Sequence, residues 1–191
     1  AGQELNYAEQ ALKATPTRPL DSVVVVHISE CGDRTTLTLA ELQELVASAQ
    51  RGLRRCGVSH GDVVVALVPN SIEALVGFLA SASIGAIWSS CSPEFGEQAV
   101  LDRFLQLKPD FLIAVDGYTY GGKFFDISRK VTTLVNQIPN LKGAVIFGPQ
   151  AISMPSSIGW GEFVSEHGAL DFIHVDFSHP LWVLFSSGTT G

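Results

Sequence analysis

Short apolar runs alternate with longer stretches of helical spacing along this 191-residue chain. Residues 62–68, DVVVALV, form an apolar run between Gly61 and Pro69, which is typical of a strand buried on both faces. Further strands are predicted at residues 22–28, 86–91, 111–116, 143–147 and 181–185. Helices are predicted at residues 38–57, 71–86, 92–110 and 124–138, with a short one inside the irregular segment 148–179. The alternation predicts an α/β fold, a mostly parallel sheet with helices on both faces.

Cap residues support three of these helices. Thr38 and Glu41 fit the capping-box pattern at the first one. Ser71 is the predicted cap of the second, and Ser92 with Pro93 is predicted to open the third. The basic run at residues 51–55 is interpreted as a solvated helix end, where cations are favourable.

Composition excludes several classes of protein. The formal net charge of −7, with scattered acidic residues, argues against a general nucleic-acid binder. No apolar run reaches the roughly 20 residues that a membrane-spanning helix needs, and the start of the chain lacks a signal-peptide pattern. Cys31, Cys56 and Cys91 lie far apart, which favours a reducing compartment over a disulfide framework. We therefore expect a soluble cytoplasmic (cytosolic) protein.

The predicted sheet directs attention to the loops that follow its strands, because open parallel sheets bind ligands at their carboxyl ends. These loops begin after Val68, Ser89, Val115, Phe147 and Phe185. None of the histidines shows a metal-ligand spacing.

The loop GYTYGGKF follows the predicted strand at residues 111–116. Gly117, Gly122 and Lys123 match the spacing of a phosphate-binding P-loop, which would indicate a kinase or hydrolase. The next position should carry a hydroxyl for Mg²⁺, but it is Phe124. Two alternatives remain open: a glycine-rich turn with a solvated lysine, and a lysine that binds phosphate in another geometry.

The loop SSCSPEFG joins a predicted strand to a predicted helix. Ser92 and Pro93 are explained by helix capping, whereas the small polar residues before them are not. Cys91 is a candidate nucleophile, although no histidine lies nearby in sequence to act as its base.

The chain ends on SSGTTG, directly after the predicted strand 181–185. Glycines permit the positive φ angles of an anion-binding nest, and the hydroxyls can donate to phosphate oxygens or bind Mg²⁺. A polar loop without a ligand is the alternative. The predicted contacts for the phosphates of a nucleotide are Ser186, Ser187, Gly188, Thr189, Thr190 and Gly191.

LFSSGTTG resembles the phosphate-binding signature of the adenylate-forming enzymes, the acyl-CoA synthetase and luciferase superfamily. The resemblance covers nearly all of the chain. WSSCSPEFG together with VDGYTYGGK is most similar to the acetoacetyl-CoA synthetase branch.

This resemblance implies a ligase that activates acetoacetate, or a similar short acid, with ATP and Mg²⁺ and transfers the acyl group to coenzyme A. Neither half-reaction needs a protein nucleophile, so positioning and charge neutralisation carry the catalysis. Thr189 and Thr190 would then contact the β- and γ-phosphates or Mg²⁺, with Thr190 the candidate metal contact. Lys123 would approach the phosphates of coenzyme A, and the SSCSPEFG loop would border the same site.

The resemblance also implies that residues 1–191 form part of the large N-terminal domain, cut within the phosphate-binding loop and without the C-terminal domain. We expect such a fragment not to complete the ligase reaction by itself. A P-loop enzyme built on Gly117–Lys123 and a truncated, non-catalytic form are the competing hypotheses.

Overall fold

The computed structural model describes residues 4–150, 152 and 154–185 of the chain. Its centre is a parallel sheet of five strands in the order β10-β9-β6-β4-β5. The strands in chain order are β4 (Val63–Leu67), β5 (Ile87–Cys91), β6 (Phe111–Val115), β9 (Gly143–Phe147) and β10 (Ser157–Gly159). The predicted α/β class and parallel sheet are therefore confirmed.

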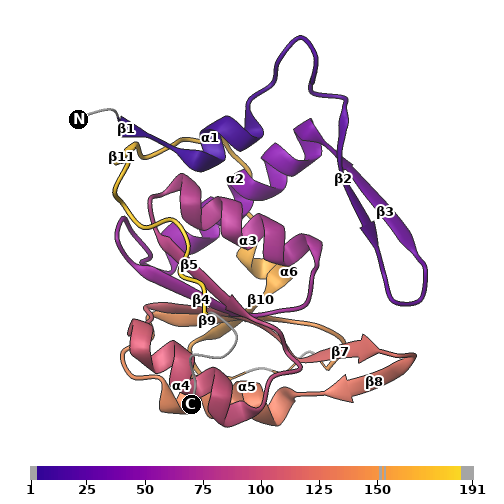
Figure 1. Cartoon of the computed structure of the whole chain (residues 1–191), viewed down its shortest axis with the longest axis vertical. Coiled ribbons are helices and arrows are strands. Elements are labelled where there is room, and N and C mark those ends of the chain that lie inside the picture. The colour runs from indigo at the N-terminus through magenta and orange to yellow at the C-terminus, as the bar shows by residue number, and fades with distance from the viewer. Residues whose placement is uncertain (1–3, 151, 153, 186–191) are drawn as a thin grey trace.

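Helices cover both faces of this sheet (Figure 1). One face carries α1 (Tyr7–Leu12), α2 (Leu39–Arg55), α3 (Ile72–Ser83) and α6 (Trp160–Phe163). The other carries α4 (Glu97–Leu107) and α5 (Ser128–Gln137). Every residue of β6 is buried, which is why its sequence is a continuous apolar run rather than an alternating one.

The caps of α2 and α3 form as predicted. The Thr38 side chain accepts from the backbone of Glu41, whose carboxylate accepts in return from the Thr38 N–H. Ser71 accepts from the N–H of Ala74 at the start of α3. These bonds satisfy backbone donors that the first helical turn leaves without partners.

The start of α4 differs from the prediction. The helix begins at Glu97 behind Gly96, which makes no side-chain cap bond, and not at Ser92. Residues 92–95 form a turn closed by the N–H of Phe95 and the carbonyl of Ser92. The carbonyls of Pro93 and Phe95 accept hydrogen bonds from the ammonium of Lys130 on α5. Lys130 thus takes the place of the backbone N–H groups that would bond to these carbonyls inside a helix.

The strand at residues 22–28 is confirmed, but its place in the parallel sheet is wrong. Residues Val23–Ile28 (β2) pair antiparallel with Arg34–Thr38 (β3) in a separate sheet. The connection between them is too short for a parallel crossover, so only a hairpin can form. The strand β3, RTTLT, was not predicted, although its three threonines are residues that favour strands.

A second hairpin follows β6. Gly117–Tyr120 (β7) and Lys123–Asp126 (β8) pair antiparallel around Gly121 and Gly122, which have φ angles of 57° and 74°. Two consecutive positive φ angles suit a tight hairpin turn, and glycine adopts them without strain. The predicted helix 124–138 consequently starts only at Ser128.

The segment after α6 runs back across α2 and α3 and includes Val175–Asp176 (β11), which pairs antiparallel with Glu4–Leu5 (β1). The basic end of α2 holds this segment instead of facing solvent alone. Arg54 makes two bonds to the Asp171 carboxylate, at 2.6 and 2.9 Å, and Arg55 binds Glu166 at 2.7 Å. Arg54 and Arg55 thus lie exposed in the last turn of α2, as the helix-end interpretation predicts, and in addition they pair with this segment.

The ion pair between Arg54 and Asp171 predicts a small loss of stability in acid. The hydrogen bond from Arg54 lowers the pKa of Asp171, so the pair stabilises the fold above the unfolded carboxyl pKa, about 3.9. That contribution is lost as the pH falls through the lower folded pKa. Because the Asp171 side chain is 62% exposed, we expect less than about 1 kcal/mol. Urea unfolding at pH 6 and pH 3 measures it, and Asp171→Asn should remove this part of the acid response.

No helix in the described part of the chain is long and apolar enough to cross a membrane.

Candidate functional site at the carboxyl edge of the sheet

A groove of about 600 Å³ lies at the carboxyl edge of the sheet and is lined by residues of β2 and β7 and of the loops between them. The loops that follow β4 and β5 form its floor, as the sheet rule predicts for a ligand site. An adjoining hollow of about 460 Å³ shares residues Val68–Ser71 with it. The residues that line the groove and recur below are Ser90, Cys91, Ser92, Pro93, Tyr118 and Tyr120.

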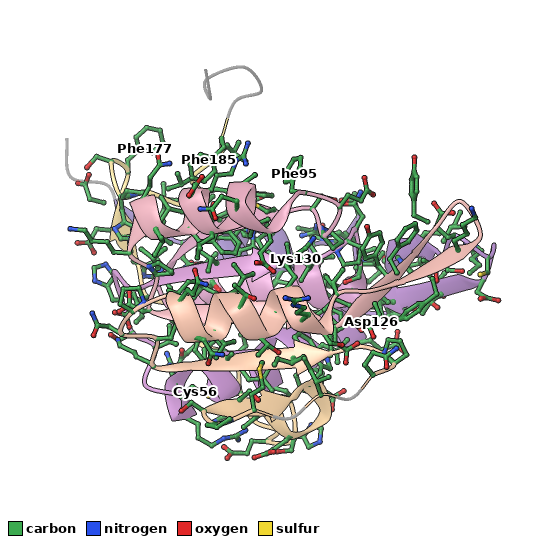
Figure 2. The ribbon with its side chains drawn as sticks, turned by 90° about the horizontal axis from the view of Figure 1, so that it is seen from below. Cys56, Phe95, Asp126, Lys130, Phe177 and Phe185 are labelled. Atoms are coloured by element: carbon green, nitrogen blue, oxygen red, sulfur yellow. The ribbon has the colours of Figure 1, made fainter. Side chains whose placement is uncertain are left out.

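Lys130 fixes one wall of the groove. Its ammonium donates to the carbonyls of Pro93 at 2.8 Å and Phe95 at 2.7 Å, which ties the β5–α4 loop to α5 (Figure 2). Burial lowers the pKa of Lys130, while Glu97 opposes this shift. The sequence did not single out Lys130, because nothing along the chain shows that α5 packs beside this loop.

Cys91 lies buried at the end of β5. Burial raises the pKa of its thiol, and the nearby charge of Arg103 only partly offsets this shift. A raised pKa lowers the thiolate fraction that a nucleophile requires. The structure thus argues against the hypothesis of a catalytic cysteine.

The P-loop hypothesis for Gly117–Lys123 is contradicted by the hairpin. A P-loop wraps its backbone N–H groups around phosphate between a strand and a helix, whereas Gly117 is paired with Asp126 and Tyr120 with Lys123. The rings of Tyr118 and Phe125 stack across the hairpin with centroids 5.2 Å apart. Lys123 is exposed beside the glycine turn, so its side chain is open to a ligand from outside.

Asp116 joins the carboxyl ends of β6 and β9. It is fully buried, and its carboxylate accepts from the N–H groups of Gln150 at 3.2 Å and Ile152 at 3.4 Å. Gly148 packs against this carboxylate so closely that a Cβ there would overlap it. Its signal in the sequence is an acidic residue directly after a fully apolar strand.

The segment 181–185 does not form the predicted strand. A single parallel bridge joins Trp182 to Trp88 of β5. The chain then leaves the sheet, and the ring of Phe185 lies 5.8 Å from the guanidinium carbon of Arg103 on α4. Phe95 contacts the same guanidinium at 5.1 Å, and both rings lie on the α4 side of the molecule (Figure 2).

The predicted phosphate contacts Ser186–Gly191, including Thr190 as the candidate Mg²⁺ contact, lie outside the described residues. Phe185, the residue before them, lies beside Arg103 of α4. Among the residues that the structure describes, no group of three or more His, Cys, Asp or Glu side chains is arranged to hold a metal ion.

Comparison with known proteins gives consistent matches along the chain. Residues 12–191 match the family model "AMP-binding enzyme". The chain is 40% identical to acetoacetyl-coenzyme A synthetase of Rhizobium meliloti over 98% of its length, and 32% identical to malonamoyl-CoA synthetase of Penicillium aethiopicum over 100%. The solved structure of acetoacetyl-CoA synthetase from Streptomyces lividans superposes with a TM-score of 0.92 at 41% identity, over 100% of this chain.

The matched region is one part of each of these proteins. The chain spans 29% of the Rhizobium relative, 28% of the Penicillium relative and 29% of the Streptomyces structure. Because the family model matches nearly the whole chain, the family assignment does not depend on a short motif. The chain belongs to the AMP-binding enzyme family.

Proposed function

We propose that this chain is part of an ATP-dependent acid–CoA ligase and supplies residues that bind the nucleotide phosphates. The observation that carries this proposal is the similarity of the whole chain, SSGTTG included, to acetoacetyl-CoA synthetases and to the AMP-binding family. The groove at the carboxyl edge of the parallel sheet supports it, because open α/β sheets bind their ligands at that edge.

The proposed reaction has two steps. The substrate carboxylate attacks the α-phosphate of ATP, which forms an acyl-adenylate and releases pyrophosphate. The thiol of coenzyme A then attacks the acyl carbon, which forms the thioester and releases AMP. Positioning and charge neutralisation suffice for both steps, and the buried Cys91 is not required in either.

The SSGTTG residues are proposed to hold the phosphates. The backbone N–H groups of Gly188 and Gly191 and the hydroxyls of Ser186 and Ser187 would donate to phosphate oxygens. Thr189 and Thr190 would contact the β- and γ-phosphates, with Thr190 also touching the Mg²⁺ that accompanies ATP.

The proposed acid substrate is a short 3-oxo carboxylate. Two relatives are named for acetoacetyl-CoA and malonamoyl-CoA synthesis. Acetoacetate and malonamate both carry a carbonyl two carbons from the carboxylate and differ only in a terminal methyl or amino group. We propose acetoacetate because the relative of higher identity is named for it. All three cysteines are free, which supports the cytosol as the site of this activity.

Acid-dependent exchange of labelled pyrophosphate into ATP tests this function in the full-length protein that carries the chain. We expect exchange with acetoacetate, weaker exchange with malonamate, and little with acetate, which lacks the 3-oxo group. Exchange that is equally fast without any acid would contradict the proposal.

Lys123 is proposed to bind a phosphate of coenzyme A. The lysine is exposed on the hairpin, and Tyr118 and Tyr120 of the paired strand β7 line the adjacent groove. A Lys123→Ala substitution removes one charge-assisted contact, so KM for coenzyme A should rise about five- to tenfold. KM for ATP should stay unchanged. Steady-state thioester formation measures both constants.

Two variants control this experiment. Lys123→Arg keeps the charge and should restore most of the affinity for coenzyme A, while Lys13→Ala removes an exposed lysine far along the sequence and should change neither constant. A rise in KM for ATP alone would instead favour the P-loop interpretation.

We also propose that the isolated 191-residue chain does not complete the reaction, since it covers under a third of the length of its relatives. Thioester formation by the isolated chain would contradict this.

A further inference from the structure

Ser89 is the one hydroxyl of the SSCS run that is fully buried and bonded to the segment leading to SSGTTG. It lies in β5, an edge strand of the sheet, and its Oγ donates to the carbonyl of Val183 at 2.9 Å. Nothing in the sequence pattern around residues 89–92 assigns Ser89 a role.

The segment begins to pair with β5 as a parallel strand would. The Trp88 N–H donates to the carbonyl of Leu181 at 3.0 Å, and the Val183 N–H donates to the carbonyl of Trp88 at 2.8 Å. If the parallel pairing continued, the N–H of Ser90, two residues after Trp88, would donate to the carbonyl of Val183. The described bridges between these segments end at Trp88 and Trp182.

The Ser89 hydroxyl donates instead to the Val183 carbonyl, which is the acceptor that this next backbone bond would use. Side chains stand roughly perpendicular to a sheet, whereas ladder donors lie in its plane. A bond from a side chain therefore turns the Val183 carbonyl out of the sheet plane and directs the chain away from β5. Leu184 and Phe185 follow, and Phe185 contacts Arg103 on α4.

Upstream contacts hold the rest of this segment, so Ser89 acts on its last part. Gln50, fully buried, donates to the carbonyl of Asp171 at 2.6 Å, and Asn6 donates to that of Ile173 at 2.8 Å. His179 is bonded to the carbonyl of Gly85 at 2.9 Å. Among the residues that the structure describes, the bond from Ser89 is the last polar contact of this segment with β5.

We infer that Ser89 is a positioning residue that ends the pairing of this segment with β5 and sets where the chain leaves the sheet, just ahead of the proposed phosphate-binding residues 186–191. The inference rests on the proposed function for its kinetic consequence. Loss of the hydroxyl leaves the Val183 carbonyl free to pair with Ser90, which would prolong the strand and shift the residues that follow.

The test compares Ser89→Ala with Ser81→Ala in the full-length protein. Ser81 is equally buried and also donates to a carbonyl, that of Gly77 at 2.8 Å, but within α3. We expect Ser89→Ala to raise KM for ATP in pyrophosphate exchange about three- to tenfold, the scale of one buried hydrogen bond, with KM for coenzyme A unchanged. Ser81→Ala should leave both constants unchanged. Equal kinetics in the two variants would overturn the inference.

A second pair guards against misfolding of Ser89→Ala. Ser89→Thr and Ser89→Val add the same extra volume and differ in the hydroxyl, so Thr should bind ATP more tightly than Val. Hydrogen–deuterium exchange at Leu184 and Phe185 gives a readout that does not depend on activity, and these amide exchange rates should change in Ser89→Val but not in Ser81→Ala.

If the unmodified protein shows no acid-dependent pyrophosphate exchange, the proposed function fails. If the amide rates also match across all variants, the positioning role fails.

Discussion

A Thr190→Val substitution is expected to lower acetoacetate-dependent ATP–pyrophosphate exchange about 100-fold. Removing one donor that stabilises developing phosphate charge has an effect of this order. Valine matches the shape of threonine but lacks the hydroxyl proposed to contact phosphate and Mg²⁺, so the loss should fall mainly on kcat. Initial exchange rates at saturating ATP measure it.

Thr190→Ser keeps the hydroxyl and should retain most of the rate. Thr133→Val is the matched distant control, since Thr133 is half-buried on α5 and, within the described residues, its hydroxyl bonds to the carbonyl of Arg129 in the same helix. A Thr190→Val enzyme with unchanged exchange would show that this hydroxyl does not touch the phosphates.

Asp116→Ala is expected to lower the free energy of unfolding by about 3 kcal/mol. The substitution leaves the N–H groups of Gln150 and Ile152 without their buried acceptor. Gly148→Ala should cost a similar amount, because its Cβ would overlap the Asp116 carboxylate and Gly148 has a φ of 125°. Urea unfolding of the full-length protein, followed by tryptophan fluorescence, measures both changes.

The double variant provides the sharper test of this contact. With the carboxylate removed, the overlap at residue 148 disappears, so the combined loss should be smaller than the sum of the single losses. Gly161→Ala is the control, since nothing lies within 4 Å of the added Cβ, and it should change stability little. Strict additivity would show that Asp116 and Gly148 do not act together.

Four strands of the central sheet, β4, β5, β6 and β9, were predictable because most of their residues are buried, whereas the short, half-buried β10 was not predicted. Burial of this kind leaves a continuous apolar run that stands out against the polar loops, as at β4, β6 and β9. The caps at Thr38 and Ser71 were equally readable, because each bond joins residues three positions apart.

The errors arose where distant contacts decide the structure. Lys130 binds the carbonyls of Pro93 and Phe95 and so delays the start of α4. Ser89 removes the carbonyl that would have extended pairing at residues 181–185. Lys130 and Ser89 are each far in sequence from the carbonyls they bind, so the local sequence pattern around those carbonyls does not reveal the bonds.

The candidate site was predicted in outline and missed in detail. The rule that ligands bind at the carboxyl ends of strands located the groove, and the glycines of SSGTTG suggested an anion site. The supporting residues Asp116, Ser89 and Lys130 were not recognised, because their roles depend on burial and on which loops meet in space.

The nucleotide product formed with acetoacetate and coenzyme A tests the central claim most directly. Chromatographic separation of the nucleotides after reaction of the full-length protein should show AMP, in equal amount to the thioester. An adenylate-forming ligase releases AMP and pyrophosphate, whereas a P-loop kinase or hydrolase leaves ADP. ADP as the product, or a thioester formed without AMP, would contradict the proposed function.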